Sequence, residues 1–441
     1  MLDRLLTVAA DLSPPFVLLE DGRGAGTSIL AWAPRNRVRL EWSEATVGAL
    51  DALALDGEYI GAIAYDLGLS PHALRRGPMI EQPLADLFAP TQRITLRPGG
   101  EPEIVGDDAR YRWAAAGESR LRGRAEASTH GAQPGAPPGP RERQAAPLRA
   151  VRPAERPAPA SRRPEPHAPA SRRSLDQAHF EDAVRRALEY IRAGDIYQVN
   201  LSVAECVALE EPPFEVYRRL RAINPSPWMG YADFGDWQLV CGSPELLVEV
   251  REGVARARPI AGTRKKTGNA ATDVAMRREL VTDAKEAAEH VMLVDLARND
   301  LGRVAEFGSV RVAELRAVEE YSHVMHLVSD VRATLVPGAT PFDVFRALFP
   351  GGTITGTPKI RAMEIIGELE PVARGFYTGA LGWTGPQAAQ WNIVIRSAVV
   401  RDGEAVMQAG AGIVADSDPA REWKESLRKA AALRLAMGLE E

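Results

Sequence analysis

The chain is poor in cysteine and has no long apolar run. Its only two cysteines, Cys206 and Cys241, form neither a CxxC pair nor a Cys/His spacing typical of a zinc site. We therefore expect two free thiols, as in a reducing cytoplasm. No apolar run reaches the roughly 18 residues of a membrane-spanning helix. The opening residues, MLDRLLTVAADLSPPF, include an acidic residue and lack an apolar core, which argues against a secretory signal and favours a cytoplasmic location.

A large excess of charge of either sign is also missing. The formal net charge is −5, and the chain is 45% hydrophobic and 26% charged, as in an ordinary globular enzyme. Nothing in this balance predicts a nucleic-acid partner or a membrane surface. No internal repeat is visible at the periods of solenoids or propellers. At 441 residues, the chain can form two or three domains, or one large domain with an appendage.

One segment, residues 117–172, lacks almost all large apolar side chains. Proline, alanine, arginine and glycine dominate it, so it cannot bury enough surface to offset its chain entropy. We predict a disordered linker between an N-terminal subdomain, 1–116, and a larger domain, 173–441. Because arginines outnumber glutamates in the linker, a basic arm for an anionic partner is the alternative.

Strand and helix patterns are mixed on both sides of the linker. Residues 1–114 contain the short β-like runs FVLLE, SILAWA, RVRLEW, EYIGAIAYDL and ITLRP. After the linker, the pattern predicts helices over 174–195 and 283–298, the first closed by Gly194, with strands over 196–207, 229–235, 237–244 and 246–250. Two late strands are expected around ALGW and WNIVIRSAVVR. Without a regular βαβ rhythm, this order favours a large α+β domain.

Two segments, KEAAEH and REWKES, each place a pair of glutamates three residues apart. In the first pair, Glu286 and Glu289 continue the helical stripe of Leu293 and Leu296 rather than oppose it. An ionised carboxylate on a buried face is costly unless it is paired or bound to a cation. Carboxylate oxygens are ligands that suit Mg²⁺, so a shared metal is one interpretation.

The second pair, Glu422 and Glu425, follows a helix start at which Asp418 can cap and Pro419 occupies the first turn. Here an ordinary explanation competes with the metal. Glu425 and Lys429 stand four residues apart and could form an exposed ion pair on the helix surface.

Further candidates surround these helices. FPGGTITGTPK (349–359) is a glycine-rich turn into a helix that suits a carboxylate better than a nucleotide, because it lacks the P-loop order; a tight connector is the alternative. Small residues at 408–419 would let backbone approach a ligand. Arg396 could bind a carboxylate or simply end a strand, His326 could be structural, and Glu245 could be a general acid or a surface glutamate.

Taken together, the motifs resemble the chorismate-utilising enzymes, a family that includes the large subunits of anthranilate synthase and aminodeoxychorismate synthase and the isochorismate and salicylate synthases. The matching stretches fall within about 195–426 and are DIYQVNLS, NPSPWM, GSPELLV, RPIAGTR, KEAAEHVMLVDLARNDLGRV, HVMHLVS, FPGGTITGTPKIRAMEIIGELEP, YTGALGW, NIVIR and GAGIVADSDPAREWKES. The N-terminal part shares PFVLLED, SILAWAP and AYDLG, and the linker has no counterpart. The resemblance implies the large mixed α/β sandwich of anthranilate synthase component I.

The resemblance also implies a role for individual residues. Both glutamate pairs would face one Mg²⁺ that holds the carboxylate of chorismate, with Glu289 and Glu425 as direct ligands and Glu286 and Glu422 beside them. Glu245 would be the general acid for loss of the C4 hydroxyl. The remaining positions would lie beside the ring and enolpyruvyl group or bind substrate: His326, Thr353, Tyr377, Arg396, Gly410, Ala411, Gly412, Ala261, Gly262 and Thr263.

The sequence gives conflicting indications of which family member it resembles. Water-using members carry a lysine where this chain has Gln198, and a glutamine cannot act as a base, so ammonia is the expected nucleophile. DIYQVNLS, GGTITGTPK and AYDLG resemble aminodeoxychorismate synthase. Ala261, however, replaces the nucleophilic lysine of many such enzymes and is usual in anthranilate synthase.

We therefore expect amination of chorismate to 4-amino-4-deoxychorismate, in p-aminobenzoate and folate biosynthesis, with anthranilate synthase as the alternative. The chain has no cysteine-containing amidotransferase signature, so the resemblance implies a separate glutamine amidotransferase subunit that supplies ammonia. A non-catalytic paralogue or binding module is the hypothesis from another class.

Overall fold

The computed structural model describes residues 1–23, 26–41, 55, 57–68, 77–110, 112–116, 171–320 and 324–439. The predicted linker, 117–172, lies almost entirely outside these residues, so the prediction of disorder and the domain boundary at 116 stay predictions. No helix in the described part of the chain is long and apolar enough to cross a membrane.

The N-terminal part forms most of the strands that its short apolar runs predict. Its elements are α1 (Leu2–Ala10), β1 (Phe16–Glu20), β2 (Ser28–Leu40), β3 (Tyr59–Ile63), the short 3-10 helix η2 (Tyr65–Gly68), β4 (Ala85–Leu96) and β5 (Glu103–Val105). The run SILAWA and the first four residues of RVRLEW belong to one long strand, β2, whose pairing with β4 shifts register between Pro34 and Asn36. Proline lacks the N–H that a regular ladder needs, which accounts for an irregularity at this point.

After the linker, strands and helices alternate irregularly. The elements are β6 (Arg172–Arg173), α3 (Gln177–Ala193), β7 (Gln198–Ala208), α4 (Pro213–Ile223), β8 (Trp228–Asp233), β9 (Gln238–Ser243), β10 (Leu246–Arg251), β11 (Val254–Ala257), β12 (Ile260–Lys265), α5 (Ala270–Thr282), α6 (Ala284–Gly302), β13 (Arg311–Glu320), β14 (Val324–Thr334), α7 (Pro341–Leu348), β15 (Gly356–Thr357), α8 (Lys359–Leu369), β16 (Ala380–Thr384), β17 (Ala388–Ile393), β18 (Ser397–Arg401), β19 (Glu404–Ile413) and α9 (Pro419–Ala436).

Helix ends follow local chemistry that the sequence already contains. Asp176 caps α3 by accepting from His179 N, and Gly194 ends this helix in the left-handed conformation. Asp418 caps α9 by accepting from Arg421 N, and Pro419 is its first residue. The end of the first helix at Gly194 and the start of α9 at Asp418 and Pro419 are confirmed, whereas α3 begins at Gln177, three residues after the predicted start at 174. The segment WNIVIRSAVVR is not one strand: it divides into β17 and β18, and Arg396 lies between them with φ of 53°.

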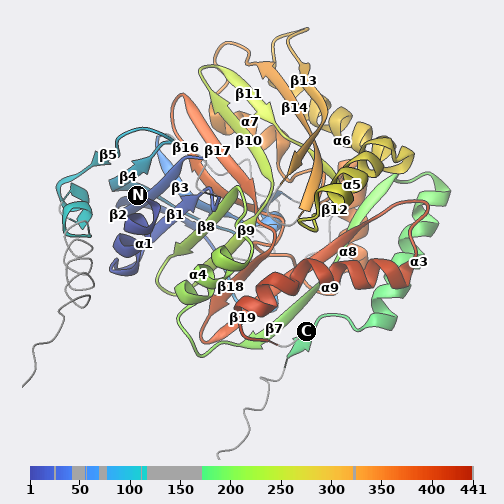
Figure 1. Cartoon of the computed structure of the whole chain (residues 1–441), viewed down its shortest axis with the longest axis horizontal. Helices are drawn as coiled ribbons and strands as arrows, with labels where there is room; N and C mark the ends of the chain where they lie inside the picture. Colours follow the sequence, from blue (N-terminus) through green and yellow to red (C-terminus); the bar gives the residue numbers. More distant parts are fainter. Residues whose placement is uncertain are drawn as a thin grey trace, which may run out of the picture.

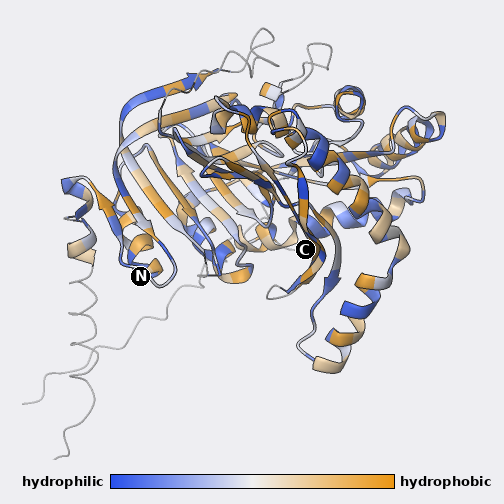
Figure 2. Cartoon of the chain, turned by 90° about the horizontal axis from the view of Figure 1, so that it is seen from above, coloured by the Kyte–Doolittle hydropathy of each residue, from blue (hydrophilic) through white to orange (hydrophobic). Residues whose placement is uncertain are grey.

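All described strands belong to one hydrogen-bonded network of antiparallel pairs, and the N-terminal strands are part of it. β1 pairs with β8, and β3 pairs with β16. The largest apolar core draws on both parts of the chain: Phe88 and Phe234 meet edge to face, and Trp237 stacks on Phe376 with ring centroids 4.5 Å apart. Figure 2 shows the hydrophobic positions concentrated on the strands in the middle of the molecule. The α+β fold class is confirmed.

Three helices approach the strands that carry the candidate residues. In Figure 1, α9 crosses the front of the molecule, whereas α5 and α6 lie together at its right. α9 packs on β19, and α6 packs on β12 and β14. The helices with the two glutamate pairs therefore pack on different strands, α6 on β12 and β14 and α9 on β19, and these strands carry candidate residues.

Candidate active site

Glu245 is the most deeply buried of the candidate acidic residues. It lies in the short connection between β9 and β10 and is 6% exposed. The Thr353 hydroxyl donates to its Oε1 over 2.7 Å. Burial raises the pKa of Glu245 to about 7, although the Thr353 hydrogen bond and the Lys429 charge oppose this rise. A carboxyl group with this pKa can hold a proton near neutral pH and donate it.

A small cavity of about 40 Å³ adjoins Glu245. Its wall combines apolar side chains from α6 and α7 with backbone of the glycine-rich turn. It is lined by Glu245, Leu246, Leu247, Ala257, Arg258, Pro259, Leu293, Leu296, Ala297, Asp300, Leu348, Gly351, Gly352, Thr353 and Ile393. Leu293 and Leu296, the leucines that extend the first glutamate stripe, therefore face the same space as the buried acid.

His326 lies on β14 opposite the predicted substrate-binding stretch of β12. Its Nδ1 is 3.0 Å from Thr263 Oγ1 and 3.2 Å from the Gly262 carbonyl oxygen. Burial lowers the pKa of His326 to about 4, so the imidazole is neutral at neutral pH. A neutral ring can hydrogen-bond a substrate without adding a charge. Ala261, the first residue of this stretch, is 7% exposed and pairs with Leu327 of β14.

Gln198 of β7 contacts Glu289, one member of the first glutamate pair, close to β19. Its Nε2 donates to Glu289 Oε1 over 3.3 Å, whereas its own Oε1 is buried and accepts no hydrogen bond from the described residues. A Cβ atom on Gly412 would lie 2.7 Å from Gln198 Nε2 and 3.9 Å from Glu289 Oε1. A side chain at this position would displace the Gln198 amide, so glycine leaves room for the close approach of β19 to these side chains.

Glu286 lies against β12 and is held by an arginine. Arg264 Nη1 donates to Glu286 Oε1 over 2.9 Å, and the same guanidinium also binds Glu279 and Asp283. A Cβ atom on Gly262, whose φ is 72°, would lie 2.9 Å from Glu286 Oε2. The first pair of glutamates therefore lies between two glycine positions, on β12 and on β19.

The second glutamate pair forms the ion pair that its spacing allowed. Lys429 Nζ lies 2.9 Å from Glu425 Oε1 and donates to the Gly410 carbonyl over 3.0 Å. Burial opposes ionisation of Glu425, but the charge and hydrogen bond of Lys429, together with the charges of Arg428 and Arg396, lower its pKa. Glu422 lies one turn earlier on α9 and is partly buried.

In this conformation the four carboxylates do not form a metal cluster. Within the described ranges, no three His, Cys, Asp or Glu side chains lie close enough together to hold an ion. The chemistry of the donors still suits Mg²⁺, because all four are carboxylates. Glu289 lies beside Gly412 of β19, and Lys429, the ion-pair partner of Glu425, donates to the Gly410 carbonyl of the same strand. Arg264 and Lys429 now balance part of the charge of the glutamates. The assignment of Glu286, Glu289, Glu422 and Glu425 as ligands stays a prediction.

Tyr377 and Arg396, two residues predicted to bind a carboxylate of the substrate, lie in turns that contain a residue with positive φ. Thr378 and Arg396 both have positive φ, 60° and 53°, a conformation that costs energy for a side chain with a Cβ atom. Tyr377, next to the first of them, is 7% exposed. The Arg396 guanidinium donates to the Lys429 carbonyl of α9. Ala411 differs from its glycine neighbours, because its side chain is fully buried in a core that includes Trp423, so only its backbone can face a ligand.

Several residues of the site were absent from the sequence-based prediction. Arg264 and Lys429 pair with the glutamates, although only the spacing of Lys429 to Glu425 signalled a contact. Lys359 is buried and donates to Asp300 over 2.7 Å beside the cavity. Arg374 contacts three segments of the site at once. Periodicity does not signal the contacts of Arg264 with Glu286, of Lys359 or of Arg374 with Ile354 and Asn200, because these join residues about 20 or more positions apart.

Comparisons with known proteins show the family and the fold of the chain. A family model described as chorismate binding enzyme matches residues 16–434. Aminodeoxychorismate synthase component 1 of Bacillus subtilis is 52% identical over 263 residues, which cover 59% of this chain and 56% of that protein. Anthranilate synthase component 1 of Pseudomonas aeruginosa is 49% identical over 276 residues, which cover 62% of this chain and 56% of that protein. The chain thus spans little more than half the length of these curated relatives.

A solved structure matches over a larger share of the chain. Anthranilate synthase component I from Streptococcus pneumoniae superimposes with a TM-score of 0.70 at 31% identity, and covers 93% of this chain and 92% of its own. The expected fold type, that of anthranilate synthase component I, is confirmed by this similarity.

Proposed function

Because the chain belongs to the chorismate binding enzyme family, we propose that it aminates chorismate with ammonia to give 4-amino-4-deoxychorismate. The observation that carries this proposal is the buried carboxyl group of Glu245, with a pKa of about 7 and a hydrogen bond from Thr353. A general acid of this strength is what removal of the C4 hydroxyl, a poor leaving group, requires.

The protein residues can be assigned to the proton steps. Glu245 donates its proton to the C4 hydroxyl, which leaves as water when its C–O bond breaks. Ammonia supplies the electron pair of the new C–N bond and afterwards loses one proton, which balances the one that Glu245 gave up. His326, neutral at neutral pH, binds beside the ring without repelling an attacking amine by charge.

The glutamate pairs supply the site for a divalent cation. We propose that Glu289 and Glu425 bind Mg²⁺ directly and that Glu286 and Glu422 act beside them. When bound, Mg²⁺ neutralises and positions a carboxylate of the substrate. For this, the glutamates must exchange their contacts with Arg264, Lys429 and Gln198. Tyr377, Arg396 and the backbone of Gly410 to Gly412 would bind the second carboxylate.

The side chain of Gln198 supports ammonia rather than water as the nucleophile. It is 2% exposed and is not basic at neutral pH, so it cannot activate water in the way a lysine can. We propose that a separate glutamine amidotransferase subunit supplies this ammonia, as the family resemblance implies.

Anthranilate synthesis is the second candidate, and Ala261 favours it. A methyl group at this position cannot form a covalent bond with C2 of chorismate. Of the neighbouring lysines, Lys266 is tied to Glu320 on the surface by a 2.8 Å ion pair. It therefore offers no replacement nucleophile in this conformation. A binding module without activity is not supported by the raised pKa of Glu245, for which such a module has no use.

Product identification separates these functions. Purified protein is incubated with chorismate, Mg²⁺ and an ammonium salt, with and without added aminodeoxychorismate lyase. We expect p-aminobenzoate only when lyase is present. Anthranilate fluorescence without lyase would establish the second candidate, and unchanged chorismate in both reactions would contradict the proposed activity.

A further inference from the structure

Arg374 is a buried arginine that the proposed chemistry does not use. It lies between α8 and β16 and is 3% exposed. Its Nε and Nη2 donate to the two carboxylate oxygens of Glu370, at 3.0 and 2.7 Å. A buried arginine–carboxylate pair is not by itself evidence of function, because its desolvation can cost as much as its attraction contributes.

The other donors of Arg374 reach the segments that carry the active-site residues. Nη1 donates to the Ile354 carbonyl over 2.8 Å, directly after Thr353. Nη2 donates to the Asn200 carbonyl over 2.8 Å, on the strand that carries Gln198. The fifth hydrogen bond runs from Nη1 to the Thr378 hydroxyl oxygen, over 3.3 Å. Each of the five N–H groups of the guanidinium thus has an acceptor.

The partners of this guanidinium are fixed in turn. Glu370 Oε1 also accepts from the backbone N and the hydroxyl of Ser202, at 2.9 and 2.8 Å. The guanidinium carbon lies 4.8 Å from the ring centroid of Tyr65 and 5.7 Å from that of Tyr377, close enough for attraction to both aromatic faces. Arg374 therefore connects β7, the glycine-rich turn and the turn before β16 in one rigid arrangement.

We propose that Arg374 is a positioning residue for the amination of chorismate: its guanidinium holds the Ile354 and Asn200 carbonyls so that Thr353 faces Glu245 and Gln198 faces the substrate. This inference rests on the proposed function and extends it. Only arginine can make these contacts, because its planar fork directs five donors along fixed lines, whereas a lysine ammonium has three donors on a flexible stem.

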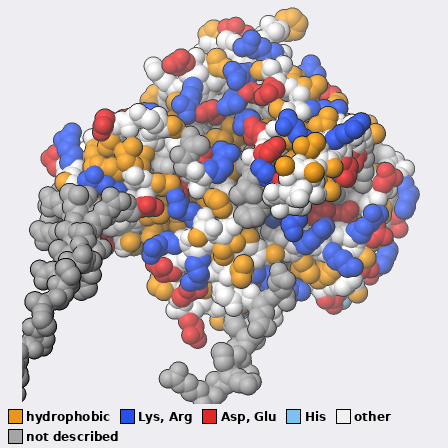
Figure 3. Space-filling view, in the orientation of Figure 1, with side chains coloured by type: hydrophobic (Ala, Val, Ile, Leu, Met, Phe, Trp, Pro, Cys, Tyr) orange, Lys and Arg blue, Asp and Glu red, His pale blue; other side chains and the backbone are white. Residues whose placement is uncertain are grey.

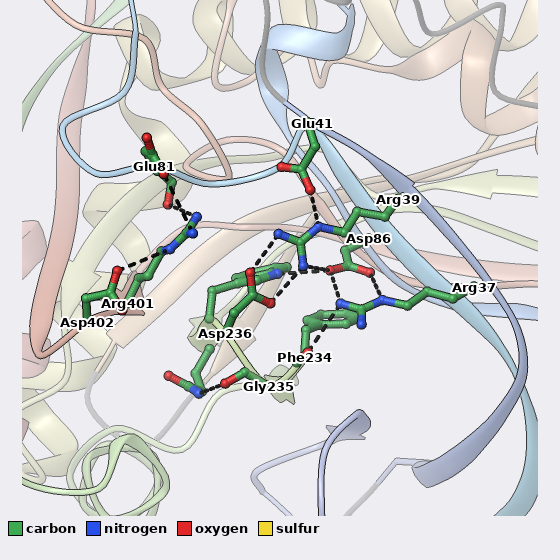
Figure 4. A network of polar contacts seen from close by, with 12 residues as sticks. Arg37, Arg39, Glu41, Glu81, Asp86, Phe234, Gly235, Asp236, Arg401 and Asp402 are labelled. Atoms are coloured by element: carbon green, nitrogen blue, oxygen red, sulfur yellow. Dashed lines mark hydrogen bonds and ion pairs between the residues drawn. The ribbon is translucent and has the colours of Figure 1, made fainter.

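The first test is Arg374→Lys, which keeps the charge and removes the fork. We expect kcat to fall about 10- to 100-fold, since small displacements of reacting groups have effects of this size, while KM for chorismate changes less than about threefold. The matched control is Arg37→Lys. Arg37 also pairs through two nitrogens with a buried carboxylate, Asp86, but in a network that contains none of the site residues, as Figure 4 shows. We expect kcat of this control to stay within about twofold of wild type.

The second test is the pH profile of kcat/KM, which a merely structural role would not move. The Thr353 hydrogen bond lowers the pKa of Glu245, so Arg374→Lys should raise this pKa and shift the basic limb to higher pH. Thr353→Val should give the same shift, and the double variant should add nothing further. The charged groups that face Glu245, namely Lys429, Arg258 and Asp300, are unchanged in all three variants.

A variant that keeps more of the native contacts guards against loss of the fold. Glu370→Gln preserves the volume but turns one acceptor of the guanidinium into a donor. It should cause the same changes to a smaller extent. Wild-type kcat and an unmoved basic limb in folded Arg374→Lys or Glu370→Gln would overturn the positioning role. If instead the wild-type protein does not aminate chorismate, the proposed function fails before Arg374 is tested.

Discussion

Two parts of this site use glutamate in opposite ways: the buried acid Glu245, and the rim, by which we mean the four predicted metal ligands Glu286, Glu289, Glu422 and Glu425. Glu245 is 6% exposed and its pKa is raised to about 7 by burial. The side chain of Glu425 is 44% exposed, and the charge of Lys429 lowers its pKa despite partial burial. Near neutral pH the first can donate a proton, whereas the second is a carboxylate that can bind a cation. Two glutamates in one site therefore gain different chemistry from environment alone.

The surroundings of the rim reinforce this difference. Figure 3 shows described lysine, arginine, aspartate and glutamate side chains interspersed on one face of the molecule. Among these mixed charges, an exposed carboxylate exchanges partners at little cost, because exposed ion pairs contribute only about 0–1 kcal/mol. The buried carboxyl group of Glu245, by contrast, has few charged or polar groups nearby among the described residues that could replace its present contacts. The comparison predicts a large loss of kcat on substitution of Glu245, and smaller changes in Mg²⁺ binding on substitution of the rim residues or their ion-pair partners.

The largest effect is expected for Glu245→Gln. The amide keeps the volume and can still accept from Thr353, but it cannot donate an acidic proton, so kcat should fall about 10²- to 10⁴-fold. Steady-state rates measure this, and an unchanged melting temperature would show that the fold is intact. Glu249→Gln, on the strand β10 that follows Glu245 and paired with Arg251, is the control. A loss below about threefold would remove Glu245 from its role as the acid.

A smaller but distinct effect is expected for Glu289→Gln. Loss of a direct carboxylate ligand should weaken Mg²⁺ binding by at least about 10- to 100-fold, the range found when a metal site loses a group that only supports a ligand. Calorimetric titration of the substrate-free protein measures this without relying on turnover. Glu364→Gln, which breaks a partly exposed pair with Arg361 on α8, should bind Mg²⁺ like wild type. Equal affinity in all three proteins would contradict the metal assignment.

The pH dependence of kcat/KM tests the role of the buried acid Glu245 directly. Because Glu245 must be protonated to act, kcat/KM should fall as pH rises through about 7, approaching a tenfold loss per unit at higher pH. The rates must be compared at a constant concentration of free NH₃, since ammonium itself deprotonates as pH rises. A profile that stays flat to pH 9 under these conditions would show that no group with this pKa acts as the acid.

The smallest effect is expected for Lys429→Met. Removing the ammonium frees Glu425 from its ion pair, so Mg²⁺ should bind about twofold more tightly, in line with the weak energy of such helix pairs. The same titration as for Glu289→Gln measures it, with Arg361→Met as the control on another helix. Weaker binding would mean that Lys429 supports the cation site through the Gly410 carbonyl rather than competing for Glu425.

Local features of the chain were enough to predict much of the fold and part of the site. Gly194 marks the end of α3, and Asp418 with Pro419 marks the start of α9, because capping is chemistry between near neighbours. The i, i+4 spacing of Glu425 and Lys429 anticipated their ion pair. The division between β17 and β18 was not predicted, because Arg396 adopts a left-handed conformation that residue propensities disfavour.

By itself, the sequence determined the helices α3, α6, α8 and α9, the cap residues Gly194 and Asp418, most strands and the types of residue that could perform acid and cation chemistry. Only the tertiary structure decided which carboxyl group is buried, that Arg264 and Lys429 hold the glutamates in this conformation, and that Arg374 joins three distant segments. The physical reason is that pKa values and hydrogen bonds depend on solvent exclusion and on atoms a few ångströms away. These neighbours come from residues that are far apart in the chain.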